Sequence, residues 1–337
     1  MKAYLIRRLL LIIPTLIGIS LVTFFMIQLA PGDPAELRAR SGENLSGANK
    51  DAINSEIIEA TRKIYQLDKS LPIQYLLWLK RLITLDFGYS IQDHRSVSAK
   101  IRERLPITII LSIFSILIAY LIAIPLGIYS ATHSRDWGDR IITFILFMLY
   151  SLPTFWIATL AIVFLCGGDF FSWFPPAGIE SLYYFEKPSW WGRLTDRAWH
   201  LVLPIICLTY GSFAFLSRQM RSGMLEVIRQ DYIRTARAKG LQERVVICKH
   251  ALRNSLIPIL TLVADILPAM IGGSVIIESL FSIPGMGNLS FEAILYRDYP
   301  VIMAVFTVSA FLTLAGILVS DLLYAVVDPR ISFDALN

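Results

Sequence analysis

Charged residues are scarce in this chain of 337 residues: Lys, Arg, Asp and Glu make up 17%, while hydrophobic residues make up 55%. A soluble domain typically holds about 25% charged and about 45–50% apolar residues. The missing charges leave apolar runs of about 20 residues, the length that crosses the hydrocarbon core of a bilayer. The composition therefore excludes a soluble globular protein and predicts an all-α protein that spans a membrane several times.

The chain also lacks the motifs by which many proteins hold nucleotides or perform hydrolysis. No Gly-Lys dipeptide occurs anywhere in the sequence, and a P-loop needs that lysine beside its glycine-rich turn to hold phosphates. No Ser/His/Asp or Cys/His arrangement presents itself either. We therefore predict no catalytic residue and expect that the chain is not an enzyme.

Metal-ligand patterns are missing as well. The three cysteines (Cys166, Cys207 and Cys248) fall on separate segments, and the four histidines are isolated from one another. Neither set has the spacing of a zinc site, so we expect no metal and no cofactor bound by this chain. The net charge of +5 is read as membrane topology rather than nucleic-acid binding.

Six apolar runs are long enough to span a bilayer. They cover about residues 9–30, 107–132, 141–166, 201–217, 255–277 and 301–327. The first run is too long for the apolar region of a cleaved signal peptide, so we interpret it as a retained helix. The polar insert that follows it shows helical spacing at 55–65 and 76–85. The sequence thus divides into 1–98, with the first span and the insert, and 99–330, with the other five spans.

The basic residues predict the orientation. From Arg218 to Arg253, nine Lys and Arg residues stand against three acidic residues. The positive-inside rule places this loop, 218–254, in the cytoplasm. Both termini are then cytoplasmic, and the insert after the first helix lies on the outer, periplasmic side.

Asp265 is the clear ionisable residue inside a span, and a carboxylate there is costly by about 2.5–3.5 kcal/mol on insertion scales. Two interpretations stay open: a wet pathway that contacts a substrate amine, or a buried hydrogen-bonded carboxylate. With Pro268, Gly272 and Gly273 it forms a candidate pathway. Proline within five spans indicates either packing irregularity or hinges; these residues are Pro14, Pro125, Pro153, Pro204 and Pro268.

The cytoplasmic loop contains the segment Asp231-Tyr-Ile-Arg-Thr-Ala-Arg-Ala-Lys-Gly240, which predicts a short basic helix. Gly240 is a natural stop because the residue after a helix often needs positive φ. Ala236 and Ala238 are small and would let another surface approach. Two apolar stripes are expected, one of Leu225, Ile228 and Tyr232 and one of Val245, Cys248 and Leu252. On the residues alone, a basic face that only sets topology and contacts lipid is the more usual interpretation of such a loop.

Eight segments, in order along the whole chain, resemble ABC importer permeases of the dipeptide/oligopeptide/nickel family, which are inner-membrane components of binding-protein-dependent transport systems. They are Tyr4-Leu-Ile-Arg-Arg8 with Pro14-Thr15, Ala30-Pro-Gly-Asp-Pro34, Leu85-Asp-Phe-Gly88, Ile124-Pro-Leu-Gly127, Thr235-Ala-Arg-Ala-Lys-Gly240 with His250-Ala-Leu-Arg-Asn-Ser-Leu-Ile-Pro258, Phe281-Ser-Ile-Pro-Gly-Met-Gly287, Arg297-Asp-Tyr-Pro300 and Val327-Asp-Pro-Arg330. Cys166-Gly-Gly-Asp-Phe-Phe171 resembles the subgroup for oligopeptides and microcin C-type peptides.

The resemblance implies a type I ABC importer permease fold in a bacterial cytoplasmic membrane. It implies a second homologous permease subunit, two P-loop ATPase subunits that use ATP and Mg²⁺, and an extracytoplasmic substrate-binding protein. The segment from 231 to 258 would couple the ATPase to the spans. The implied ATPase contacts are Tyr232, Arg234, Thr235, Ala236, Arg237, Ala238, Lys239 and Gly240.

Two departures narrow the family branch. Arg234-Thr235-Ala236 stands where other importer families begin this helix with Glu-Ala-Ala, and Arg253-Asn254 stands near the place of a Leu-Pro pair. Two other classes of protein remain as alternatives: an ion-coupled secondary carrier that uses Asp265, and a membrane scaffold that transports nothing.

Overall fold

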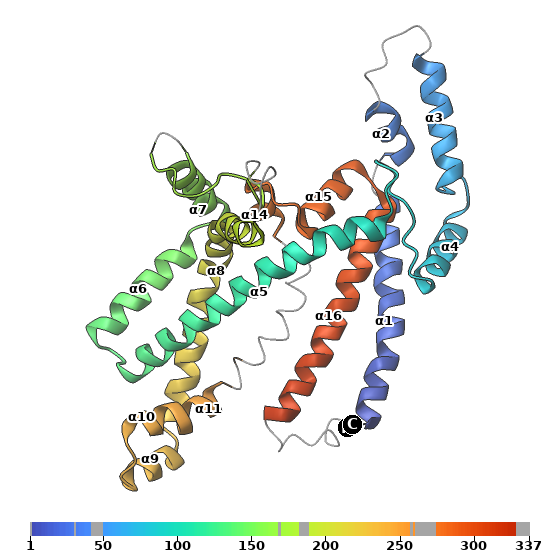
Figure 1. Ribbon diagram of the computed structural model, residues 1–337. Coiled ribbons are helices and arrows are strands. Elements are labelled where there is room, and N and C mark those ends of the chain that lie inside the picture. Colours follow the sequence, from blue (N-terminus) through green and yellow to red (C-terminus); the bar gives the residue numbers. More distant parts are fainter. Residues whose placement is uncertain are drawn as a thin grey trace. The chain divides into compact units, whose positions relative to one another are not determined.

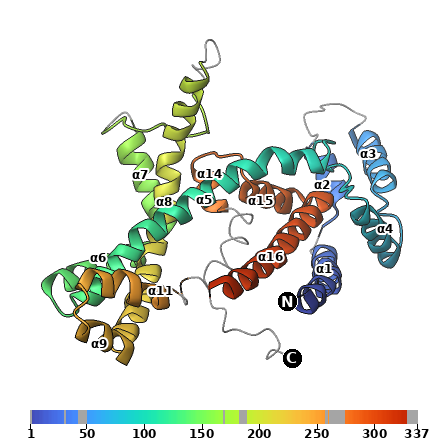
Figure 2. The ribbon, with the colours of Figure 1, turned by 60° about the horizontal axis from the view of Figure 1, so that its bottom comes forward.

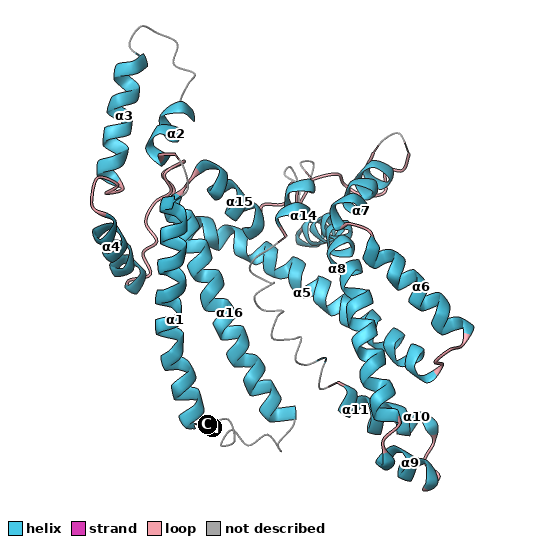
Figure 3. Ribbon diagram, turned by 180° about the vertical axis from the view of Figure 1, so that it is seen from behind, coloured by secondary structure: helices cyan, strands magenta, loops and turns pink. Residues whose placement is uncertain are grey.

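The apolar runs form long helices in a computed structural model (Figure 1) that describes residues 2–29, 32–41, 50–167, 170–181, 189–256, 259 and 274–327. The chain divides into two compact units. The first is Met1–Pro106 with Gly285–Leu314, and the second is Ile107–Pro284 with Ala315–Asn337. Figure 3 shows helices joined by loops, and Tyr89 and Ser96 form an isolated β-bridge between described residues.

The first unit contains the amino-terminal span and the insert that follows it. Its helices are α1 (Lys2–Leu29), α2 (Pro34–Ser41), α3 (Lys50–Ile64), α4 (Leu71–Ile83), α15 (Met286–Tyr296), the start of α5 (Val97–Thr132) and the first half of α16 (Tyr299–Val327). The helical spacing at 55–65 and 76–85 is confirmed by α3 and α4. A buried apolar cluster, which includes Val97, Met286 and Val305, joins α5, α15 and α16.

Two of the sequence motifs meet in this unit, together with the segment that precedes α5. The buried Asp298 carboxylate accepts hydrogen bonds from the Ile91 N–H at 3.0 Å and from the Ser90 hydroxyl. Its neighbour Arg297 has positive φ, and its guanidinium donates to the Gly32 carbonyl at 2.7 Å. These bonds fasten the chain after α1 and the chain before α5 to the link between α15 and α16.

The second unit is built on α8, a helix of 39 residues that is kept intact around Pro204. Its other elements are α5 from residue 107, α6 (Trp137–Ser151), α7 (Thr154–Ala161), the π-helix η1 (Ile162–Cys166), α9 (Asp231–Ala238), α10 (Glu243–Val245), the π-helix η3 (Val246–Ala251), α11 (Leu252–Ser255) and α14 (Val275–Leu280). In Figures 1 and 2, α6 lies along α8, and α9 to α11 gather at the carboxyl end of α8.

Helices α5 and α8 approach closely at Gly127. A Cβ atom on Gly127 would lie 2.6 Å from the Met220 Cβ and 2.7 Å from the Ser217 carbonyl oxygen. Real Cβ atoms do not come that near to backbone, so only glycine allows this contact. Ala119, Ala123 and Leu216 continue the contact along the same two helices.

A buried ion pair ties α6 to α8. The Arg221 guanidinium donates to both carboxylate oxygens of Asp139, at 3.2 and 2.8 Å. Asp139 also accepts from the Ser130 hydroxyl of α5 and from the Arg135 N–H at 3.0 Å. One carboxylate, 4% exposed, therefore links α5, the turn after it, α6 and α8.

The described residues include four helices long and apolar enough to cross a membrane, or five if one bent pair counts as a single span. The bent pair is α6 with α7 and η1, at 91°. Pro153 causes the bend, because it has no N–H and forces Leu152 into an extended conformation, with ψ of 126°. The predicted span at 141–166 is thus broken at Pro153, one of the prolines expected to disturb a span.

Two predicted spans are longer than expected, and one lies largely outside the described residues. Helix α5 begins ten residues before the predicted 107, and α8 extends well beyond 201–217 at both ends. Residues 218–228, predicted as loop, continue α8 as helix, because capping signals first appear at 229–231. Most of 255–277 is not described, whereas α1 and α16 agree with the predicted first and last spans.

Candidate functional site

The predicted coupling segment forms a short helix directly after α8. Helix α8 ends at Ile228, Gln230 adopts an extended conformation, and α9 begins at Asp231. Within α9, the Thr235 hydroxyl donates to the Asp231 carbonyl at 2.9 Å. Asp231 in the first turn and Arg237 in the last turn match the helix dipole.

One face of α9 is anchored in the protein. Ile233 is fully buried and Ala236 is 7% exposed. They belong to a cluster with Met220 and Met224 of α8 and with Val246, Ile247 and Ala251 of η3. Burying a side chain of isoleucine size stabilises by about 1.5–3 kcal/mol, so α9 is fastened to α8 rather than hanging free.

Gly240 ends the helix as predicted. Its φ is +76°, and its N–H donates to the Arg237 carbonyl at 2.9 Å. The Leu241 N–H reaches back to the Ala236 carbonyl at 3.4 Å. These two bonds satisfy carbonyls that the end of an α-helix leaves unpaired.

A salt bridge closes the turn between α9 and α10. Arg237 donates to both carboxylate oxygens of Glu243, at 3.1 and 2.6 Å. The hydrogen bond and the charge of Arg237 lower the pKa of Glu243 against a smaller effect of burial. The side chains are 40% and 59% exposed, so this pair contributes to the shape of the turn more than to stability.

The predicted contact residues divide between two faces. Tyr232, Arg234, Thr235, Arg237, Ala238, Lys239 and Gly240 are exposed. Ala236 faces the protein instead, so of the two small alanines only Ala238 lies on the outer face. Arg234 is 74% exposed and lies 3.6 Å from Asp231, a distance at which an exposed pair contributes little.

Both predicted apolar stripes are correct only in part: Leu225, Ile228 and Leu252 pack against the buried cluster, but the other members do not. The break at 229–230 separates Ile228 from Tyr232, which is 43% exposed, with its hydroxyl accepting from Asn254 at 2.7 Å. In the second stripe, Val246, Ile247 and Ala251 are buried, whereas Val245 and Cys248 are exposed. The cause is the π-helix at 246–251, because its wider turn shifts the buried positions away from α-helical spacing.

Other predicted positions can be placed only in part. Asp265, Pro268, Gly272 and Gly273 lie outside the described residues. Sequence reasoning missed Asp139 and Arg221, which lie just behind the α9 cluster on α6 and α8. Each residue stands beside an apolar run, but no local pattern in the sequence pairs the two.

Two family profiles cover almost the entire chain. Residues 123–333 match the binding-protein-dependent transport system inner membrane component, and residues 1–112 match the N-terminal part of such membrane components. The chain belongs to this family of inner membrane components. Along the chain, the first match ends and the second begins within α5, and α9 falls inside the second.

Curated relatives of this inner membrane component match it from end to end. The oligopeptide transport system permease protein AppB of Bacillus subtilis is 41% identical over 99% of this chain and 100% of its own length. The dipeptide transport system permease protein DppB of Alkalihalophilus pseudofirmus is 38% identical over 99% of this chain and 100% of its own length. The predicted family resemblance is therefore confirmed.

A solved structure shows the same fold. A chain of the MetNI methionine ABC transporter aligns with a TM-score of 0.51 at 17% identity, covering 68% of this chain and 97% of that one. This inner membrane component is thus an all-helical membrane protein with the fold of an ABC transporter permease, as the sequence predicts. Its several apolar helices agree with a multi-pass protein of the inner membrane.

Proposed function

We propose that this chain is a permease subunit of an ATP-driven importer that carries peptides across the cytoplasmic membrane. It would work with a second homologous permease, two P-loop ATPase subunits and an extracytoplasmic binding protein. The peptide permeases that match it over nearly its full length support this proposal. With six spans, both termini would be cytoplasmic, and α2 to α4 would lie on the periplasmic side.

The observation that carries the proposal is the two-sided construction of α9. Its inner face, at Ile233 and Ala236, is buried against α8 and η3. Its outer face presents Arg234, Ala238 and Lys239 to a partner. A push on the outer face would therefore reach α8, and through Asp139 and Arg221 it would reach α5 and α6.

Physically, the ATPase would act as a ligand of α9. A ligand shifts a conformational equilibrium only as far as its contacts differ between the two states. The ATPase subunits change shape with bound nucleotide, so contact with α9 would be the place where that difference enters the permease. The permease itself would bind no nucleotide and no cofactor, and ATP with Mg²⁺ would belong to the ATPase.

A pulldown with an uptake assay tests the proposal. The chain, tagged at its carboxyl end, is extracted in mild detergent, and the proteins that co-purify with it are identified. In parallel, cells that produce the same protein are assayed for uptake of labelled di- and oligopeptides. Gly240→Pro removes the N–H that donates to Arg237 and forbids the positive φ. We expect the wild type to retain a P-loop ATPase and import peptide, and the variant to lose both while inserting normally.

Gly211→Ala is the matched control, because a Cβ at Gly211 has no neighbouring atom within 4 Å. It should keep both ATPase and uptake. Normal uptake by a correctly inserted Gly240→Pro protein, or the absence of any ATPase from the wild-type complex, would refute the proposed coupling.

A further inference from the structure

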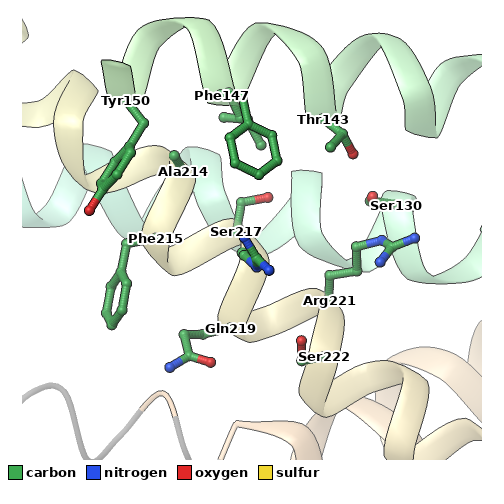
Figure 4. Close-up of a pocket in the computed structure, with 12 residues that line it drawn as sticks. Ser130, Thr143, Phe147, Tyr150, Ala214, Phe215, Ser217, Gln219, Arg221 and Ser222 are labelled. Carbon is green, nitrogen blue, oxygen red and sulfur yellow. The ribbon is translucent and has the colours of Figure 1, made fainter. Parts of the chain in front are cut away.

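A cavity of about 500 Å³ opens between α6 and α8 beside the Asp139–Arg221 pair. Figure 4 shows Tyr150 and Phe215 toward one end and Arg221 with Ser130 toward the other. The lining residues are Ser130, Thr143, Leu146, Phe147, Tyr150, Ala214, Phe215, Ser217, Arg218, Gln219, Arg221 and Ser222. The proposed coupling role of α9 makes no use of this cavity.

The charge in the cavity is one-sided. Two arginines line it and no Asp or Glu does. Arg221 is neutralised by Asp139, which lies outside the lining. Arg218 has no carboxylate within ion-pair distance among the described residues, and its guanidinium lies over the Phe147 ring at 5.7 Å. The aromatic contact holds this cation at the wall of the cavity, so one positive charge faces the open space with no counter-ion from the part of the chain that the structure describes.

The chemistry changes along the cavity. Phe215 and Arg218, the arginine that would hold the ligand, are three residues apart on α8, which is about 4.5 Å along a helix, and Arg221 lies one turn farther on. The cationic end adjoins the end of α8 that leads to α9, and the aromatic end lies farther into the membrane run. A polar end and an apolar end at this separation match a phospholipid, with its charged phosphate and its acyl chains.

We propose that this cavity binds an anionic phospholipid of the cytoplasmic leaflet. The lipid phosphate pairs with Arg218, and an acyl chain lies along Phe147 and Phe215. The proposal rests on the cytoplasmic placement of α9 in the proposed function. Anionic lipids are enriched on that side of the membrane, and basic pockets between spans on that side suit their headgroups. Free phosphate would leave the aromatic end of the cavity unused.

Native mass spectrometry of the intact purified transporter tests the assignment. The complex is delipidated and then titrated with phosphatidylglycerol, or with phosphatidylcholine carrying the same acyl chains, or with inorganic phosphate. We expect a phosphatidylglycerol adduct on the permease subunit that phosphatidylcholine and phosphate do not reproduce. Arg218→Ala should weaken the adduct about fivefold, the effect of one basic residue on anionic-lipid binding, and Arg218→Lys should retain most of it.

Two further variants separate the headgroup from the acyl chain. Arg244→Ala removes one exposed positive charge outside the cavity and should leave the adduct unchanged. Ala214→Trp fills the apolar end and should remove the adduct without a change in charge. Equal binding of both lipids, an unchanged adduct in Arg218→Ala, or a peptide substrate that displaces the lipid would overturn the proposal. Co-purification of the ATPase in the same preparations reports separately on the proposed function.

Discussion

Gly240 is needed for its backbone conformation and not for the space around it. Its φ is +76°, and the space around a Cβ there is empty, so any substitution acts through conformation and not through a clash. Left-handed geometry costs an L-residue about 1–2 kcal/mol, with asparagine tolerated better than alanine.

We therefore predict a graded series in peptide uptake and ATPase retention: Gly240, then Asn, then Ala, with Pro inactive. The measurement is initial uptake rate normalised to the membrane content of the permease. Equal activity of the Asn, Ala and Pro variants would contradict a helix stop that depends on positive φ.

The Arg237–Glu243 pair gives a pH-dependent prediction. Because Arg237 lowers the pKa of Glu243 below its ordinary value of 4.5, the pair stabilises the folded state fully above about that pH. The contribution is lost as the pH falls through the lower folded-state pKa. An exposed pair contributes about 0.2–1 kcal/mol. The melting temperature of wild type should exceed that of Glu243→Gln slightly at pH 7, and the difference should vanish at acidic pH. A difference that grows on acidification would contradict this sign.

Features of single residues could be predicted where the neighbouring sequence alone determines them. Gly240 could be assigned because helix stops have a strong local signal. A break at Pro153 is expected from its missing N–H, but the angle of the bend is not. The inward turn of Ala236 depends on a buried Ile233 and on η3, so tertiary packing and not the sequence pattern decides which alanine a partner can reach.

At the scale of the elements, the α6–α8 contact depends on one buried carboxylate. Arg221→Ala would leave Asp139 ionised, 4% exposed and without its cation. Removing one partner of a buried pair destabilises by about 3–5 kcal/mol, and we expect the lower end because the Arg221 side chain is 32% exposed.

The measurement is the thermal stability of the purified permease. Asp139→Asn combined with Arg221→Gln removes both charges while keeping similar shapes, and it should recover part of the loss. A double variant no better than Arg221→Ala would show that the pair does not act as a unit.

The α5–α8 contact depends on the absence of a side chain. Gly127→Ala would press a methyl group to 2.7 Å from the Ser217 carbonyl oxygen, so the helices must separate, at a cost of about 1–3 kcal/mol. Gly211→Ala, on α8, meets nothing within 4 Å and should be neutral or slightly stabilising. Melting temperatures and folded yields of the two variants compare them directly. Equal stability would rule out close packing at Gly127.

The π-helix η3 is the element at which predictions from α-helical periodicity fail. Stripe predictions assume 3.6 residues per turn, and this spacing located the helices α3 and α4 correctly. They placed Val245 and Cys248 inward because nothing in 246–251 signals a wider turn. The predicted ends of two helices also differ from the observed ends. The charged residues near 99–106 and 218–228 are typical of loops, yet α5 and α8 continue through them.

At the scale of the whole molecule, the sequence predicts the class of fold well, because apolar runs in a membrane protein must become helices. The ordered motifs identify the family, and two of them lie at a joint of the first unit, where Gly32, Arg297 and Asp298 take part in hydrogen bonds. Long-range partners such as Asp139 with Arg221 carry no local pattern, so they emerge only when the helices are placed side by side.

The central claim is that the outer face of α9 touches the ATPase. A single cysteine at Ala238, in a protein with Cys166, Cys207 and Cys248 replaced by serine, can be cross-linked in membranes with a short bifunctional reagent. Gln92→Cys, exposed in the first unit, is the matched control. The account predicts a cross-link from residue 238 to a P-loop ATPase that changes in yield with bound nucleotide, and none from residue 92. Absence of any ATPase cross-link at 238 in a transporter that still imports peptide would contradict it.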